Sequence, residues 1–339
     1  MQSMDRRTFL KLGAVALAGL ALPKPLLQVQ ATAHEGPAPT SLGRIILWRD
    51  AVREAPSPAA TWVAWRTFNE IIPLYGAVVG AAPWPTNPVW YRTHEGYIHS
   101  GYVQPVENQP QTEVIEEVSP PGFWAEVSVP IAEARWQPTS PYVARRLYYE
   151  TVYRVTGAMQ AEDGSWWYQL HEGLVWGPGG PYVPAWSLRR ITREDLAPIS
   201  PARPNKWMQI NIEEQSLTCF EGYRPVFHTP AATGLWNTST PLGEFRVLYK
   251  RYTRRMIGGE GANHYDLPGI PFPVYFAPNG VAIHGTYWHN DYGRRHSHGC
   301  VNVPSQAARW IFRWVHPPIS YNKYTQFSGA DNGTRVVVI

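Results

Sequence analysis

One cysteine, Cys300, stands in a setting that suits covalent chemistry. It follows a glycine in the run Ser297-His298-Gly299-Cys300-Val301-Asn302, and a histidine, His284, lies sixteen positions upstream. A thiolate can attack a carbonyl, an imidazole can take the thiol proton, and backbone N–H groups in a glycine-framed turn can hold the developing oxyanion. These residue types therefore predict acyl transfer through a thioester at Cys300.

The second cysteine, Cys219, has no such setting. It lies in residues 207–220, a segment of alternating apolar residues in which a buried free thiol is common. A structural disulfide between Cys219 and Cys300 is the alternative for an exported chain. A zinc site is a further alternative, because several histidines lie near Cys300, but the spacing contains no CxxC, HxxxH or HExxH pair.

The order of these residues resembles the signature of the L,D-transpeptidases, the YkuD-type catalytic domain. The resemblance covers roughly residues 204–339. It is carried by several further motifs in the expected order: Ala232-Thr233-Gly234, Thr240-Pro241-Leu242-Gly243-Glu244-Phe245 and Gly333-Thr334-Arg335-Val336-Val337-Val338. The gap between His284 and Ser297 is short for the family, which leaves the details of the intervening loop open.

The resemblance implies a role for each residue of the motif. Cys300 is the nucleophile, His284 is the general base, and Gly299 allows a tight turn at the nucleophile. It also implies that His298 and Ser297 shape this turn and that Asn302 anchors it by hydrogen bonds. We expect no metal and no organic cofactor to take part.

The loop between His284 and Ser297 is expected to contact the substrate. Tyr287 and Trp288 can line the donor groove, and Arg295 can meet a carboxylate of a stem peptide, with a solvated arginine as the alternative. We expect His289 and His296 at the rim of this loop.

The family resemblance implies a reaction on peptidoglycan stem peptides. Cys300 would attack the carbonyl of the third residue of a tetrapeptide stem and release the terminal D-alanine, and an amine of a neighbouring stem would then form a 3→3 crosslink. Hydrolysis of the same intermediate would give an L,D-carboxypeptidase. A wall-binding protein with an inactive catalytic domain is the non-enzymatic alternative. A papain-like peptidase is disfavoured because its cysteine precedes its histidine in the chain.

The elements around these residues are predicted to be mostly strands. Residues 207–212, 245–249 and 334–339 alternate with a period of two, whereas residues 304–315 place apolar side chains at helical spacing after a proline. The family fold implies a β-sandwich-like catalytic domain with a helix after the catalytic cysteine, over residues 204–339.

An internal repeat precedes this domain. The run Trp90-Tyr91-Arg92-Thr93-His94-Glu95-Gly96 matches Trp167-Tyr168-Gln169-Leu170-His171-Glu172-Gly173, and each run reads as short strands between turns. The pattern resembles bacterial SH3-like modules, and it predicts two tandem small β-barrels at 43–110 and 122–198. Such modules bind the wall or act as spacers, and both options stay open. Proline-rich linkers are expected between them.

The N-terminus resembles a twin-arginine export signal, with Asp5-Arg6-Arg7-Thr8-Phe9-Leu10-Lys11 before an apolar run and a small-x-small cleavage pattern near residue 33. Residues 1–33 would then be a signal peptide of a protein exported to the cell envelope, in contact with the membrane only if the signal stays uncleaved. They carry four basic residues and one acidic residue, so their removal lowers the net charge from +4 to +1. A nearly neutral mature chain predicts no nucleic-acid partner.

Overall fold

The computed structural model describes residues 38–84, 86–171, 180–261, 264–329 and 331–339. Its strands outnumber its helices in these ranges, so the prediction of a mainly β chain is confirmed. The elements lie in one compact unit, Pro39–Ile339. The predicted signal peptide, 1–33, lies outside the described residues. No helix in the described ranges has both the length and the apolar character that a membrane crossing requires.

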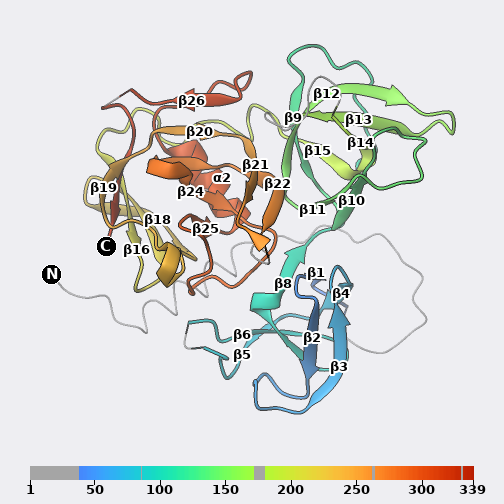
Figure 1. The fold of residues 1–339 in the computed structure, drawn as a ribbon, viewed down its shortest axis with the longest axis horizontal. Helices are drawn as coiled ribbons and strands as arrows, with labels where there is room; N and C mark the ends of the chain where they lie inside the picture. The colour runs from blue at the N-terminus through green and yellow to red at the C-terminus, as the bar shows by residue number, and fades with distance from the viewer. Residues whose placement is uncertain (1–37, 85, 172–179, 262–263, 330) are drawn as a thin grey trace. The chain divides into compact units, whose positions relative to one another are not determined.

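Residues 41–106, here called the first module, form two sheets (Figure 1). The orders are β4-β1-β8 and β3-β2-β7-β6-β5, and a small core fills the space between them. The elements are β1 Ser41–Ile45, β2 Arg49–Arg53, β3 Trp62–Thr67, β4 Ile71–Leu74, β5 Ala77–Val79, β6 Val89–Arg92, β7 Tyr97–His99, the 3-10 helix η1 Ser100–Tyr102 and β8 Val103–Val106.

Residues 123–190, here called the second module, form a five-stranded sheet in the order β14-β13-β12-β9-β15 and a two-stranded sheet, β10-β11. The sheets of both modules are open, and within the described residues neither module closes into a barrel. The elements are β9 Phe123–Val127, β10 Ile131–Ala134, β11 Arg145–Tyr148, β12 Val152–Gln160, β13 Trp166–His171, β14 Tyr182–Pro184, η2 Ala185–Ser187 and β15 Leu188–Arg190.

The repeat is visible as a shared order of elements. In each module the tryptophan of the repeat lies on the second strand of a hairpin, β5–β6 or β12–β13, and a strand, a 3-10 turn and another strand follow. The hairpin registers differ, because Val78 pairs with Trp90 whereas Met159 pairs with Trp167. The longer loop of the first hairpin accounts for this shift.

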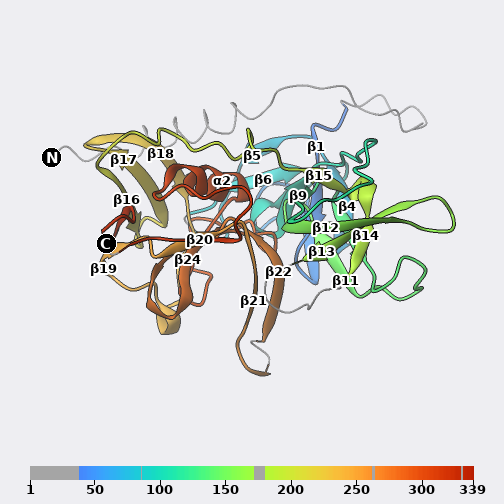
Figure 2. The same ribbon diagram turned by 90° about the horizontal axis from the view of Figure 1, so that it is seen from above.

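Residues 206–338, here called the C-terminal domain, contain two five-stranded sheets, β18-β17-β16-β27-β19 and β25-β24-β23-β20-β26, and the hairpin β21-β22. This hairpin projects from the other strands (Figure 2). The elements are β16 Lys206–Asn211, β17 Ser216–Glu221, β18 Arg224–Pro230, η3 Trp236–Thr238, β19 Gly243–Arg246, β20 Tyr249–Arg251, β21 Thr253–Gly258, β22 Tyr265–Pro271, β23 Val274–Ala277, η5 Pro278–Gly280, β24 Val281–Gly285, β25 Val301–Val303, α2 Ser305–Trp314, β26 Thr325–Phe327 and β27 Arg335–Val338.

The predicted helix is confirmed as α2, which begins one residue later than expected because Pro304 is its N-cap with ψ 142°. Its buried face contacts β24 and β22. The expectation of one strand over 245–249 is wrong: β19 and β20 belong to different sheets, and the chain passes between them at Val247. The backbone N–H of Val247 donates to Thr334, which immediately precedes β27, whereas that of Leu248 donates to Tyr275 on β23. The hydrogen bonds of the first sheet therefore end at Val247, and those of the second sheet begin at Leu248.

Candidate active site

The turn that ends at Cys300, residues 297–300 and here called the nucleophile turn, is held by its own hydrogen bonds. The Ser297 hydroxyl donates to the carbonyl of Cys300, and its oxygen accepts the N–H of Gly299 at 3.1 Å. Gly299 has φ 116°, a conformation that a side chain at this position would strain. The turn therefore fixes the position from which the thiol leaves the backbone.

A second segment, residues 232–240, anchors the nucleophile turn from outside. The Thr240 hydroxyl donates to the carbonyl of Gly299 at 2.9 Å and accepts the N–H of Gly234 at 3.0 Å. The backbone of Ala232 pairs with that of Asn302. These contacts explain why the two sequence motifs at 232–234 and 240–245 accompany the cysteine motif: they build its support.

His284 comes to the same place from β24. This strand pairs in parallel with β25, with His284 opposite Asn302. Side chains of paired residues share one face of a sheet, and residues two apart along a strand share it too. Cys300 immediately precedes β25, so this pairing brings the nucleophile turn next to the strand that carries His284.

The His284 imidazole is oriented by the backbone. Its Nδ1 lies 3.0 Å from the carbonyl oxygen of Gly285 and must be the protonated nitrogen, because a carbonyl only accepts. Nε2 then carries the lone pair that a general base needs. Burial lowers the pKa of His284 to about 4, so the ring is neutral near pH 7. The ring of Trp288 covers it, with centroids 5.9 Å apart.

The Cys300 thiol is partly exposed, and its Sγ lies 3.8 Å from the carbonyl oxygen of Gly280. Burial of the sulfur raises the pKa of Cys300, and a hydrogen bond from the N–H of Ala282 partly offsets this. At rest, the Cys300 thiol is therefore protonated and the His284 imidazole is neutral. Both cysteines are free, so the structure holds no disulfide between Cys219 and Cys300.

Two other predicted residues lie where they can support the site. Tyr287 is buried, and its ring stacks on that of Tyr148 at 5.2 Å. His298 is exposed, and its ring faces Tyr265 on β22 at 5.4 Å. The nucleophile turn thus has the hairpin β21–β22 beside it.

Arg295 has structural partners. Its guanidinium donates to the carbonyl of Gly234 at 3.3 Å, lies 3.5 Å from Glu213 and sits over the ring of Trp236. These contacts tie residue 295 to the segment that supports the nucleophile turn.

The expectation that His289 is a rim residue is wrong, because His289 is buried while His296 is exposed and stacks on it at 4.2 Å. The N–H of Asp291 donates to its Nδ1, and its Nε2 lies 2.8 Å from the side-chain amide of Asn302. The partner atom in Asn302 is the amide nitrogen Nδ2, and Asn302 Oδ1 has no hydrogen-bond partner among the described residues. Burial lowers the pKa of His289 well below its usual range, which keeps the ring neutral.

Residues 286–296, here called the site loop, are also held by the first module, which the sequence did not predict. Asn290 donates from its side chain to the carbonyls of Ser100 and Val103, and its backbone N–H donates to the carbonyl of Gly101. Arg44 on β1 donates to the carbonyl of Tyr287. The first module is therefore part of the structure around the site.

The site loop has a second attachment to the first module through Asp291. Trp84 donates from its indole to this carboxylate at 3.1 Å, and Arg294 lies over the Trp84 ring. Nothing in the sequence pattern marks Asp291 or Trp84, because their partners are separated from them by about two hundred residues along the chain.

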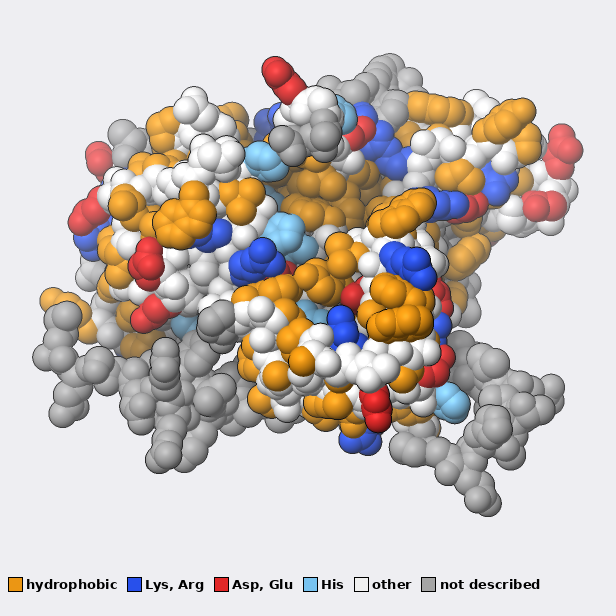
Figure 3. All heavy atoms as spheres, turned by 60° about the horizontal axis from the view of Figure 1, so that its bottom comes forward, with side chains coloured by type: hydrophobic (Ala, Val, Ile, Leu, Met, Phe, Trp, Pro, Cys, Tyr) orange, Lys and Arg blue, Asp and Glu red, His pale blue; other side chains and the backbone are white. Residues whose placement is uncertain are grey.

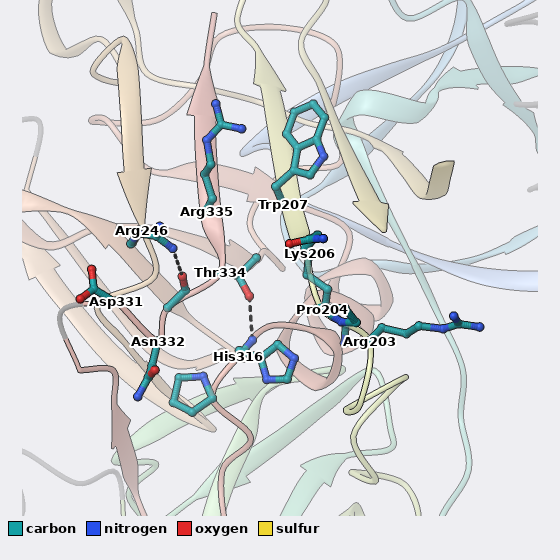
Figure 4. Close-up of a pocket in the computed structure, with 13 residues that line it drawn as sticks. Arg203, Pro204, Lys206, Trp207, Arg246, His316, Asp331, Asn332, Thr334 and Arg335 are labelled. Atoms are coloured by element: carbon teal, nitrogen blue, oxygen red, sulfur yellow. Dashed lines mark hydrogen bonds between the residues drawn. The ribbon is translucent and has the colours of Figure 1, made fainter. Parts of the chain in front are cut away.

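One cavity, of about 550 Å³, lies away from the cysteine (Figure 4). It is lined by the segments around Lys206, His316 and Arg335. The guanidinium groups of Arg203 and Arg335 extend away from one another, so they do not converge on a ligand (Figure 4). Within the described residues, no group of three or more His, Cys, Asp or Glu side chains is arranged to hold a metal ion.

Comparisons with known proteins assign this C-terminal domain. Residues 205–338 match the model of the YkuD family, the L,D-transpeptidase catalytic domain. The prediction of such a domain in this part of the chain is confirmed. No curated protein matches the chain.

Several solved structures are similar over the same share of the chain. A cysteine-to-serine mutant of the Enterococcus faecium L,D-transpeptidase is 24% identical, covering 41% of this chain and 51% of its own, with a TM-score of 0.33. L,D-transpeptidase 3 from Mycobacterium tuberculosis, solved with a faropenem-derived adduct, is 22% identical, covering 40% and 60%, with a TM-score of 0.32. The Xylanimonas cellulosilytica L,D-transpeptidase is 25% identical, covering 40% and 60%, with a TM-score of 0.28. The chain thus spans about half to three fifths of these proteins.

Proposed function

We propose that this protein is an exported peptidoglycan L,D-transpeptidase. The observation that carries the proposal is the arrangement of Cys300 and His284: a thiol on a rigid turn, and a neutral histidine whose Nδ1 is tied to the carbonyl of Gly285. A base oriented by a third group beside a nucleophile is the arrangement that acyl transfer requires. The match of residues 205–338 to the L,D-transpeptidase catalytic domain supports the same reaction class.

In the first half-reaction, His284 Nε2 takes the thiol proton as Cys300 Sγ attacks the carbonyl of the third stem residue. The tetrahedral intermediate collapses with cleavage of the peptide bond, and the imidazolium returns the proton to the leaving amine of D-alanine. In the second half-reaction, an amine of another stem gives a proton to His284 and attacks the thioester. A new amide bond forms, and the thiol is regenerated.

Support for the remaining assignments comes from the residues around the pair. Trp288 shields His284 from water, and Gly299 and Ser297 hold the nucleophile turn.

We infer that the two N-terminal modules are SH3-like, since they share an order of hairpin, strand, 3-10 turn and strand. We further infer export by the twin-arginine signal and action in the cell wall, with no cofactor.

The test is intact-mass spectrometry of the mature, reduced protein with a disaccharide-tetrapeptide. We expect an adduct of the tripeptide stem on the wild type and none on Cys300→Ala, with a crosslinked or amine-exchanged product. An adduct that releases only free tripeptide would make the protein an L,D-carboxypeptidase. No adduct and no product would overturn the enzymatic proposal in favour of wall binding.

A carbapenem gives an independent probe of the same thiol. The M. tuberculosis L,D-transpeptidase 3 structure contains a faropenem-derived adduct. We expect a carbapenem to acylate Cys300 in the wild type and to leave Cys300→Ala unchanged in mass.

A further inference from the structure

A second cavity, of about 450 Å³, lies where three parts of the chain meet. Arg44 and Phe68 of the first module form one side, Arg145 and Arg146 on β11 form another, and residues 266–268 of β22 and 287–288 of the site loop complete it. In the space-filling view, hydrophobic side chains form a hollow with histidine and basic side chains beside it (Figure 3).

This cavity adjoins the reacting groups on the side of the base. Trp288, which lines the cavity, has its ring against His284. On β22, Asp266 lines the cavity, whereas its neighbour Tyr265, on the opposite face of the strand, faces His298 of the nucleophile turn. The ring of Trp288 therefore lies between the cavity and His284.

Arg44 gives the cavity a buried positive charge without a counterion. The residue is 1% exposed, and its guanidinium donates to the side-chain oxygens of Gln104 and Asn69 and to the carbonyl of Tyr287, all neutral groups. Among the described residues, no carboxylate lies within ion-pairing distance of it. Burial lowers the pKa of Arg44 to about 10, so it stays charged near pH 7. A buried charge of this kind favours an anion nearby.

The other charged groups leave the cavity positive. Among the described residues, Asp266 is the one carboxylate that lines it, and Arg255 holds both oxygens of this group. Arg145 lies 3.5 Å from the same carboxylate, so two guanidinium groups contact this acidic side chain. Arg146 is about half exposed and pairs at 3.7 Å with Glu133, outside the cavity. Guanidinium groups are well suited to bind carboxylates.

The remaining lining is apolar or aromatic. Phe68, Leu267 and the rings of Tyr148 and Trp288 offer surfaces for the backbone and aliphatic parts of a ligand. Apolar walls with a few convergent charges are typical of sites for small organic ligands. This lining suits a short acidic peptide better than a free inorganic anion.

We propose that this cavity binds the acidic stem peptide that supplies the acceptor amine, with Arg145 and Arg146 recognising its carboxylates and Arg44 supplying a buried positive charge behind them. The inference rests on the proposed transpeptidase function. The leaving amine and the incoming amine both exchange a proton with His284, so the acceptor must arrive on the side of this residue. The cavity lies on that side and is built jointly by both modules and the C-terminal domain.

Binding is tested on full-length Cys300→Ala by isothermal titration calorimetry, with a synthetic acidic stem tripeptide and its fully amidated counterpart as probes. We expect the acidic peptide to bind at least tenfold more tightly than the amide. Arg146→Glu, at a half-exposed position, should remove this preference, and Arg145→Ala should weaken it. Arg224→Glu, an exposed charge reversal on β18, is the matched control and should keep the preference.

Turnover then separates this proposal from the function on which it rests. For Arg146→Glu, we expect the rate of transfer to an acidic stem, divided by the rate of acylation, to fall about tenfold, with hydrolysis taking a larger share. Transfer to a small amine without carboxylates should not show this fall. If all variants bind both peptides equally and the wild type still forms the Cys300 adduct, the cavity proposal is overturned and the proposed function is not. No Cys300 adduct in the wild type would overturn the proposed function, whatever the titrations show.

Discussion

Burial keeps both members of the catalytic pair uncharged at rest. It lowers the pKa of His284 to about 4 and raises that of Cys300, so each group resists the charged form. A preformed thiolate–imidazolium pair is thereby disfavoured, and the proton moves as the thiol attacks. This arrangement protects the thiol from adventitious electrophiles, while a bound donor still meets a free base.

The pH dependence of alkylation tests this protonation state. Because the pKa of Cys300 is raised, its thiolate is a minor species near neutrality, and its fraction grows about tenfold per pH unit below the pKa. We expect the rate of Cys300 modification by iodoacetamide, followed by peptide mass mapping, to rise continuously between about pH 6 and about pH 9. Cys219, which is fully buried, serves as the internal control and should stay unmodified.

A plateau of the alkylation rate below about pH 7 would contradict this assignment, since it would indicate a thiolate stabilised by a charged His284. Acylation by a donor has a separate acid limit. It needs neutral His284 and should persist until the pH falls towards about 4. The profiles for alkylation and acylation should therefore differ in shape, and apparent values will belong to the coupled pair.

At this scale the sequence identified the reactive residues but not their surroundings. Cys300 and Gly299 are adjacent, and His284 sits within a compact motif, so local pattern was enough to select them. The burial of His289 and the partners of Arg295 depend on contacts with Asn302, Gly234 and Glu213. Spacing along the chain carries no information about such contacts.

At the scale of elements, the site loop lies outside the helices and strands and depends on the first module for its position. Asn290 alone makes contacts with four residues of that module, Tyr91, Ser100, Gly101 and Val103. Asn290 is a positioning residue, because it acts through the loop and not on the substrate. The loop carries Trp288, so its position determines how His284 is covered.

Asn290→Ala tests this dependence. The change removes the side-chain donor from the carbonyls of Ser100 and Val103, of which that of Ser100 keeps the N–H of Val103, and each lost hydrogen bond costs about 0.5–1.5 kcal/mol of local stability. We expect faster amide hydrogen exchange confined to residues 286–296 and a several-fold slower acylation of Cys300, with the overall fold kept. Asn108→Ala, at an exposed position after the first module, is the control and should change neither quantity. Unchanged exchange in the loop of Asn290→Ala would show that the first module does not hold it.

The element pattern was predictable where one periodicity dominates. Helix α2 was found from its apolar spacing, and β16 and β27 from their alternation. The break between β19 and β20 was not, because both strands alternate in the same way and the change of sheet is set by long-range pairing. The repeat was visible in sequence, but the hairpin registers were not.

At the scale of the whole molecule, the second module and the C-terminal domain share one hydrophobic core. Trp124 and Val152 of the module belong to the same buried cluster as Tyr252 and Phe312. The rings of Trp124 and Tyr252 pack in a tilted arrangement with centroids 4.6 Å apart, and the Trp124 indole donates to the carbonyl of Tyr321 at 2.8 Å. Side-chain packing therefore connects the second module to the C-terminal domain across the proline-rich linker between them. The composition of the sequence does not reveal this packing.

Trp124 lies in the second module, but because it belongs to the shared core, Trp124→Ala should also destabilise the C-terminal domain. Truncating a fully buried tryptophan costs about 3–5 kcal/mol, and we expect the free energy of unfolding by urea to fall by this amount. Trp48→Ala removes a tryptophan of the first module that is 86% exposed, and it should change stability by less than about 0.5 kcal/mol. The isolated segment 204–339 lacks Trp124 and should unfold at lower urea than the full chain. Equal midpoints for segment and chain would mean that the catalytic domain is self-sufficient and that the shared core adds nothing to its stability.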